Sequence, residues 1–574
     1  MGVHGLKSFL ERNGRTRPVN IVDEIQRWKS KNSGKTPTIV FDFCSLRKRG
    51  KNKKDCICGG VREITSNPWN EIFKNLKAAG CELIFFSDQR VKHKDEKSPV
   101  ETSEYFGFYT DLYDRIDDQQ TLQEISDEWM PNFEEASIYR ELAAIASKYG
   151  EYRISVNEEC DLELAQYASN NNALAVVSND TDFLIYEGAW QLWWTAIDMN
   201  LWNELKTTEY VRKDLEDLCS LSRNQLPLFA TLLGSHFTSK YRNIFHGFHR
   251  IKDVANYVRK VGNCSLSDFD IKRIQEAVYK DAEQSANEIR QSIRNSLEWF
   301  NINSPAPILD DKLAETFLII RVNGVDMFRP YMRNMGKCHA VLARYYDLRG
   351  SENGTNLIML MMEWQKRRSG VLRQRFHDDT FDLTIWAITD VNAVSELTHI
   401  ERPIFPDFEV PPLEDLYHED DTEITEIRWK IFSWIMSLSA DVISKIKNLP
   451  NNVVLISTVL SSLVQNGLVS ELEADGILYT EYKFIDNESE MMSEEYPTVL
   501  VSRHVRAVHI YRAAFISVEE NFAIAGLLSL YHRSLNFYGV YYQNLMAQLH
   551  QMDDAQRETF IAPIKQWRTY VLNH

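Results

Sequence analysis

The sequence has few cysteines, and they are not arranged as metal ligands. Its 574 residues include 8 cysteines, of which only Cys56 and Cys58 are close together, and no Cys-x-x-Cys pair occurs. This spacing excludes a zinc-ribbon type of site and favours reduced thiols in an intracellular protein.

Long hydrophobic runs are also lacking. The longest, residues 453–464, contains three serines and a threonine and is too short to cross a bilayer. Residues 1–6 show no apolar core of a signal peptide, and Leu6 stands where myristoylation requires Ser or Thr. We therefore expect an intracellular protein of the nucleus or cytoplasm, with no membrane partner.

Positive charge is in deficit, since 65 Lys and Arg oppose 82 Asp and Glu, giving a formal net charge of −17 and a pI of about 5.4. This excludes a generally basic, non-specific nucleic-acid binder. A local exception is RKRGKNKK at 47–54, in which we single out Arg47, Lys48, Arg49 and Lys51. It is interpreted as a contact for a nucleic-acid backbone, a nuclear localisation signal or a solvated loop.

The order of strand and helix patterns predicts an α/β domain followed by helices. Up to about residue 240, apolar strand-like runs alternate with helical periodicity, which indicates a parallel sheet wrapped by helices. Beyond about residue 205 most patterns are helical. Four prolines and an acidic run mark residues 401–423 as a linker. The expected divisions are 1–265, 266–400, 401–423 and 424–574.

Carboxylates follow the strand-like runs at four places. Asp42 and Asp88 end two of these runs, Glu159 and Asp161 open a predicted helix, and Asp180 and Asp182 follow a third run. Each alone is compatible with a helix cap or a turn. The carboxyl ends of parallel strands share one edge, where converging carboxylates repel each other unless hard cations such as Mg²⁺ or Mn²⁺ bind them. The pattern predicts a two-metal phosphodiesterase site.

Several motifs in the same region resemble those of a known protein family. MGVHGL at 1–6, ECDLELA at 159–165 and SNDTDFLIY at 178–186 resemble the start, the acidic helix and the Ser-x-Asp-x-Asp segment of the XPG/flap-endonuclease superfamily, whose nuclease domain is PIN-like. The last motif is most similar to the Asteroid branch. LKTTEY at 205–210 and LPLFATLLG at 226–234 are similar both to Asteroid proteins and to the constitutive coactivators of PPAR gamma. The resemblance covers residues 1–265.

The resemblance implies a hydrolase that cuts structured or single-stranded DNA or RNA with two Mg²⁺ (or Mn²⁺) ions. These would be held by the six carboxylates Asp42, Asp88, Glu159, Asp161, Asp180 and Asp182. In place of the family's Asp-Gly-x-x-Pro segment stands DQRVKHK at 88–94. Its Arg90, Lys92 and Lys94 are interpreted as a clamp for the scissile phosphate or as a solvated basic turn.

Two departures from the family leave a second hypothesis open. His236 stands where nucleases have a seventh carboxylate, and imidazole is a poorer ligand for Mg²⁺. The Gly-Ile-Gly hairpin that grips duplex DNA is not recognisable in residues 240–251. The alternative is a nuclease-fold scaffold with little catalysis that binds RNA or protein in gene regulation or signalling, with the C-terminal helices contacting a protein partner.

Overall fold

The computed structural model describes most of the chain in two compact units. The described residues are 2–3, 5–46, 53–60, 68–88, 107, 109–128, 136–155, 160–186, 192–194, 198–235, 237–247, 249–262, 267–303, 316, 337–341, 357–374, 382–386, 398–418, 422–492, 494–528 and 537–572. The first unit consists of residues 1–50, 67–89 and 142–309, and the second of residues 51–66, 90–141 and 310–574.

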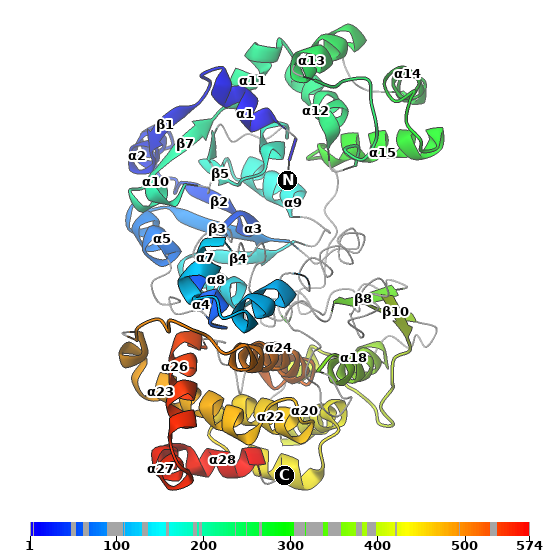
Figure 1. The fold of residues 1–574 in the computed structure, drawn as a ribbon. Helices are drawn as coiled ribbons and strands as arrows, with labels where there is room; N and C mark the ends of the chain where they lie inside the picture. The colour runs from blue at the N-terminus through cyan, green and yellow to red at the C-terminus, as the bar shows by residue number, and fades with distance from the viewer. Residues whose placement is uncertain are drawn as a thin grey trace. The chain divides into compact units, whose positions relative to one another are not determined.

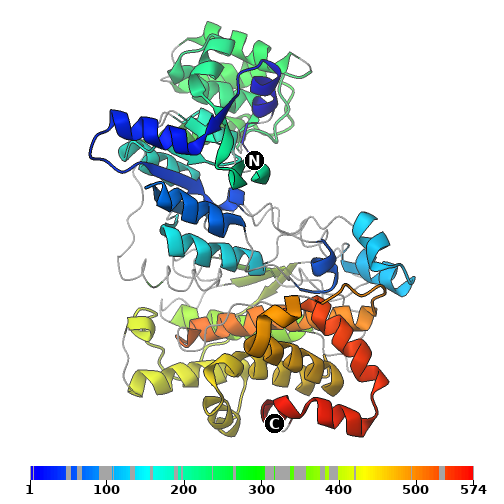
Figure 2. The same ribbon diagram turned by 90° about the vertical axis from the view of Figure 1, so that its left-hand side faces the viewer.

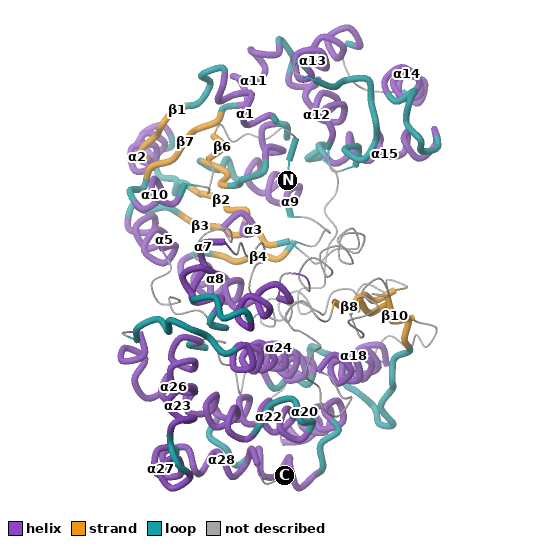
Figure 3. The backbone as a smooth tube through the Cα atoms, in the orientation of Figure 1, coloured by secondary structure: helices purple, strands orange, loops and turns teal. Residues whose placement is uncertain are grey.

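The first unit is built on a seven-stranded sheet with the order β1-β7-β6-β5-β2-β3-β4 (Figure 1, Figure 3). Its strands are β1 (Arg17–Asn20), β2 (Thr38–Asp42), β3 (Glu82–Ser87), β4 (Glu151–Ile154), β5 (Ala175–Val177), β6 (Leu192–Trp194) and β7 (Lys206–Tyr210). From β6 to β4 the strands are parallel, whereas β7 pairs antiparallel with both β1 and β6. Hence β2 lies between β5 and β3, and these three strands end along one edge.

Alternating side chains of the central strands fill two layers of core. Phe41 and Phe85 stack on one face, and Phe41 also meets Trp202 of α10 (Met199–Asn203). On the other face, Val40 and Ile84 share a core with residues of α9 (Asp161–Asn170). Helices thus cover both faces, so the functional side chains have to emerge at the strand ends.

Further helices complete this unit. They are α1 (Leu6–Arg12), α2 (Ile21–Lys31), α3 (Phe43–Leu46), α5 (Pro68–Ala78), α8 (Ala136–Tyr149), α11 (Arg212–Cys219), α12 (Leu226–Gly234), α13 (Arg250–Val261), α14 (Asp268–Val278), α15 (Ala286–Trp299) and the 3₁₀ turns η1 (Thr181–Leu184) and η2 (Arg223–Gln225). The start of α8 is grouped with the second unit. All but one residue of the apolar helix α12 is buried, which makes it the centre of the α12–α15 layer.

The second unit is mainly helical (Figure 1, Figure 2). Its helices are α4 (Lys53–Ile57), α7 (Leu122–Glu128), α18 (Leu357–Gln374), α19 (Asp415–His418), α20 (Thr422–Met436), α21 (Ala440–Lys447), α22 (Asn451–Gln465), α23 (Glu471–Met492), α24 (Ser502–Ile524), α26 (Gly539–Gln551), α27 (Asp554–Phe560), η3 (Ala562–Ile564) and α28 (Lys565–Leu572). A small sheet of order β10-β9-β8 joins β8 (Lys337–Val341), β9 (Asp382–Trp386) and β10 (Thr398–Glu401).

Two segments that branch from the sheet of the first unit belong to the core of the second. Ile57 of α4, and Tyr113 and Ile125 from the segment after β3, share a hydrophobic cluster with Val505 and Val540. The hydroxyl of Tyr113 and Nδ1 of buried His509 share a hydrogen bond of 2.7 Å. The segments that follow β2 and β3 in the chain are therefore built into the C-terminal helical unit.

The proline-rich segment after β10 is packed as well. Gln374, at the end of α18, donates to the carbonyl oxygens of Pro406 and Phe408 and accepts from the amide of Val410. Gly370 contacts the backbone of Ile404 so closely that a Cβ would not fit. Residues 401–410 therefore pack along α18. The four domain ranges expected from the sequence stay a prediction.

The predicted fold class is confirmed in its architecture, since a parallel sheet wrapped by helices precedes a mainly helical region. The sequence did not predict the strands β1, β6 and β7 or the sheet β8–β10. Within the described part of the chain, no helix combines the length and apolar character that crossing a membrane requires.

Candidate metal centre

Three neighbouring parallel strands bring carboxylates to one edge of the sheet. Asp42 is the last residue of β2, Asp88 directly follows β3, and Asp180 lies in the turn after β5. Parallel pairing of β2 with both β3 and β5 makes these ends adjacent, which is the geometry expected at the carboxyl edge of an α/β sheet.

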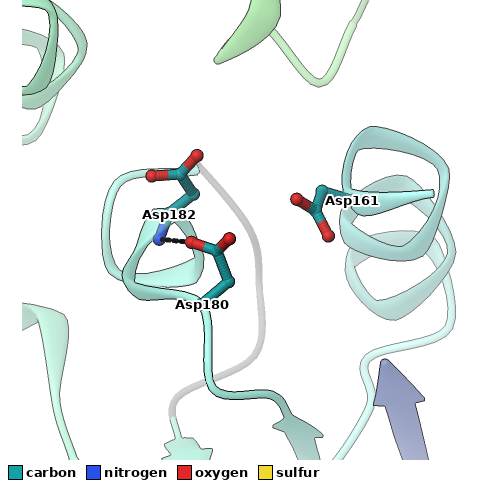
Figure 4. Close-up of side chains that lie close together, drawn as sticks. All are labelled: Asp161, Asp180 and Asp182. Carbon is teal, nitrogen blue, oxygen red and sulfur yellow. Dashed lines mark hydrogen bonds between the residues drawn. The ribbon is translucent and has the colours of Figure 1, made fainter. Parts of the chain in front are cut away.

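Three of the acidic side chains form a group that has the geometry to hold a metal ion. One carboxylate oxygen from each of Asp161, Asp180 and Asp182 lies within 4.8 Å of the other two. Asp161 comes from the first turn of α9, facing the two carboxylates of the η1 turn (Figure 4). The amide of Asp182 donates to Oδ1 of Asp180 at 3.0 Å, which fixes this pair. An all-oxygen donor set suits Mg²⁺ or Mn²⁺.

Asp42 sits deeper, in a ring of hydrogen-bond donors. Its Oδ1 accepts from the amides of Cys44 at 3.0 Å and Ser45 at 3.4 Å. Its Oδ2 accepts from the hydroxyls of Ser45 and Ser178. Burial raises the pKa of the Asp42 carboxyl above its usual range, and the charge of Asp88 raises it further, whereas the two serine hydroxyls lower it. The raised pKa therefore reflects burial first and the neighbouring negative charge second.

Asp88 is held by two cysteines. Its Oδ1 accepts from the amide of Cys160 and its Oδ2 from the thiol of Cys44, both at 3.0 Å. Burial raises the pKa of the Cys160 thiol well above its ordinary value, and the charges of Asp88 and then Asp161 act in the same direction. Cys160 therefore stays a neutral thiol and is no nucleophile.

The N-terminal segment contacts the same group of acids. The amide of Gly2 donates to Oδ2 of Asp180 at 3.1 Å, and the hydroxyl of Thr181 donates to the carbonyl of Val3 at 3.2 Å. A Cβ on Gly2, which has a φ of +33°, would collide with the Asp180 carboxylate. Only glycine fits against this carboxylate.

Comparison with curated proteins finds similarity to nuclear-receptor coactivators. The constitutive coactivator of peroxisome proliferator-activated receptor gamma from mouse is 28% identical over 296 residues, which cover 47% of this chain and 34% of that protein. The human protein is 28% identical over 289 residues, covering 47% of this chain and 30% of that protein. The chain is similar to these coactivators. This confirms the similarity that the motifs predicted.

The chain spans about a third of the length of these coactivators, and no family model matches it. Solved structures with distant likeness include the catalytic core of Rad2 in complex with DNA substrate, at 15% identity and a TM-score of 0.29 over 56% of this chain and 85% of that one. Human GEN1 in complex with Holliday junction DNA gives 14% identity and a TM-score of 0.31, over 56% and 73%. At these scores neither structure bears on the function of this chain.

The structure brings together five of the six predicted carboxylates. Asp161, Asp180 and Asp182 form the compact group, and the charges of Asp88 and Asp180 both act on Asp42. The other predicted site residues lie outside the described residues; they are Glu159, Arg47, Lys48, Arg49, Lys51, Arg90, Lys92 and Lys94. His236, which stands where nucleases have a seventh carboxylate, lies outside them as well.

Sequence reasoning missed the residues that support the carboxylates. Ser45, Cys44 and Cys160 carry no motif signal that distinguishes them from ordinary neighbours of an acid. Ser178 did carry one, as the first residue of the Ser-x-Asp-x-Asp segment, and it is fully buried against Asp42.

Proposed function

We propose that the chain is a metal-dependent phosphodiester hydrolase that cuts nucleic acid at the acidic edge of its parallel sheet. The observation that carries this proposal is the group Asp161, Asp180 and Asp182, whose oxygens converge from α9 and η1 within 4.8 Å. Beside it, Asp42 and Asp88 add buried or half-buried negative charge. Such a concentration of carboxylates is stabilised by a bound divalent cation.

In this proposal Asp161, Asp180 and Asp182 hold one Mg²⁺ or Mn²⁺ ion, and Asp88 with Glu159 contributes to a second. A bound ion of this kind supplies an activated water and neutralises charge on the phosphate during hydrolysis. Arg47, Lys48, Arg49, Lys51, Arg90, Lys92 and Lys94 are proposed as contacts to the nucleic-acid backbone. The expected location is intracellular, in the nucleus or cytoplasm.

A scaffold function is the second candidate, and the names of the curated relatives favour it. Proteins that are 28% identical over 47% of this chain are called coactivators. In this case the chain would bind RNA or protein, through the C-terminal helices for a protein partner, without cutting. Both candidates allow a formed acidic site, so only cleavage separates them.

The test uses the full chain and an Asp180→Asn/Asp182→Asn variant. We would titrate Mg²⁺ or Mn²⁺ while following the melting temperature, and then assay end-labelled flap and single-stranded DNA and RNA. Asp217→Asn is the matched control, because Asp217 is half-exposed and pairs with Lys213 outside the site.

Metal-dependent cleavage in the wild type and the control but not in the double variant supports the hydrolase. A metal-dependent rise in melting temperature without cleavage moves the conclusion to the scaffold. No response to metal in any protein contradicts the metal site itself.

A further inference from the structure

In the Asp42 carboxylate every lone-pair position is used by a hydrogen-bond donor. A carboxylate offers about four lone-pair positions. Asp42 has four donors, namely the amides of Cys44 and Ser45 on Oδ1 and the hydroxyls of Ser45 and Ser178 on Oδ2. The residue is 6% exposed. A metal ion could reach it only by displacing buried donors, which costs free energy.

The two serine hydroxyls connect Asp42 to the turn that carries the ion-binding acids. Oγ of Ser178 accepts from the amide of Asp180 at 2.9 Å. Oγ of Ser45 accepts from the amide of Asn179 at 2.8 Å, and the side-chain amide of Asn179 returns to the carbonyl of Ser45 at 3.1 Å. Since an amide N–H only donates, each hydroxyl accepts from the turn and gives its single hydrogen to Asp42.

We call the hydrogen bonds that run from Asp42 through the hydroxyls of Ser45 and Ser178 to the 178–182 turn the serine relay. The relay ends at the acidic group of Asp161, Asp180 and Asp182. The amides that Ser45 and Ser178 hold belong to Asn179 and Asp180, and Asp180 in turn accepts from the amide of Asp182. The backbone of the 178–182 turn is thereby tied to the end of β2.

We propose that Asp42 is a positioning residue: through Ser45 and Ser178 it fixes the turn that presents Asp180 and Asp182 to the metal ion, and it does not ligate the ion. The inference rests on the proposed metal site. It assigns new roles to Ser45 and Ser178, which carry no charge and contact no ion.

Two substitutions separate positioning from direct ligation. Ser178→Ala removes no carboxylate, so it leaves a directly ligating Asp42 intact and breaks only the relay. Asp42→Asn removes the anionic ligand but keeps the relay, since the amide nitrogen has two hydrogens to donate to the free lone pairs of the serine oxygens.

The experiment measures Mn²⁺ binding to the full chain by the loss of the free-ion EPR signal. We expect Ser178→Ala to weaken binding about tenfold, the size of effect of one hydrogen bond to a charged group. Asp42→Asn should bind within a few-fold of the wild type, whereas Asp42→Ala should bind much more weakly. Thr231→Ala is the control, because Thr231 is a fully buried hydroxyl with its own hydrogen bonds outside the site.

Wild-type affinity in Ser178→Ala, or equal losses in Asp42→Asn and Asp42→Ala, would overturn the inference. The melting temperatures of all variants show whether a loss of Mn²⁺ affinity reflects unfolding. Thr231→Ala shows how much affinity changes when a buried hydroxyl outside the site is removed. Mn²⁺ binding without cleavage contradicts the proposed hydrolase and leaves the positioning role standing. Absence of Mn²⁺ binding by the wild type overturns both.

Discussion

At the scale of single residues, the same amino acid has different environments along one edge of a sheet. Asp42 is almost fully buried and held by hydroxyls and amides, whereas Asp180 and Asp161 are only half-buried and face each other. Burial and donors, not residue type, therefore divide the acids between fixing the turn and binding an ion.

The contact of Gly2 with Asp180 gives a prediction at this scale. Gly2→Ala adds a Cβ that collides with the carboxylate and Thr181, so the contact of the N-terminal segment with Asp180 cannot keep its geometry. We expect Mn²⁺ binding to weaken on the order of tenfold, measured by EPR titration. Gly14→Ala is the matched control, since Gly14 has a φ of +63° with no atom within 4 Å. Equal affinities of the two variants would contradict the prediction.

The sequence predicted the acids of this site because Asp after a run of β-branched and aromatic residues is unusual. It did not predict the serine relay, because Ser45 and Ser178 are 133 residues apart and become neighbours only when β2 pairs with β5. Serine is common in turns for other reasons, so its presence after a strand indicates little by itself.

At the scale of elements, α24 and α26 are joined by a histidine pair. Nε2 of His504 and Nε2 of His550 lie 3.1 Å apart, and the two rings are stacked. Burial lowers the pKa of His504 to about 4, and His550 acts in the same direction, while Glu473 of α23 raises it and Arg503 lowers it. His504 thus stays neutral where an exposed histidine would be charged.

This pair predicts loss of stability in mild acid. Between pH 6.5 and 4 the unfolded chain binds a proton at His504 that the folded chain does not, so stability falls as pH falls through this window. We expect the melting temperature to drop less between pH 7 and 5 in His504→Gln than in the wild type, measured by calorimetry. His246→Gln, at an exposed histidine of the other unit, should follow the wild type. A wild-type pH dependence in His504→Gln would count against this account.

Elements were predictable where their pattern was long or their start and end were marked. Helix α5 begins at Pro68 and is followed by Gly80, and β3 is an apolar run between Glu82 and Ser87. The strand β6 has only three residues, too few for alternation to show. The docking of residues 404–410 on Gln374 and Gly370 is a tertiary contact that the proline content of 401–423, the basis of the predicted linker, does not reveal.

At the scale of the whole molecule, the second unit is made from three separate stretches of chain. The turn at the end of α4 carries Gly60, which meets the start of α26 at Gly539 with backbone against backbone. Gln543 donates to the carbonyl of Cys58 beside it, at 3.1 Å. The unit therefore cannot be defined by a contiguous range, and local sequence patterns carry no information about such a pairing.

The close backbone contact between Gly60 and Gly539 predicts that one added methyl group lowers the stability of the second unit strongly. In Gly539→Ala a Cβ would collide with the carbonyl of Cys58 and lie 2.7 Å from the amide of Gly60. Both are backbone atoms that cannot rotate away, so we expect about 3 kcal/mol less free energy of unfolding for this unit. Chemical denaturation measures the loss, and hydrogen exchange should rise in residues 53–60. Gly107→Ala, with nothing within 4 Å, should change neither.

Because the second unit is made from three separate stretches, its parts become available for folding at different times during synthesis. The hydroxyl of Tyr496 bonds Asp55 across 441 residues, and Gln543 reaches Cys58 across 485. At roughly 5–20 residues per second, a ribosome needs on the order of a minute to make the partners of α4 after α4 itself has emerged. Until then Ile57 and Cys58 can pack only against the part of their cluster that lies in residues 109–125, and the side that Val505 and Val540 cover stays exposed. A product that stops short of α26 would carry that exposed segment permanently.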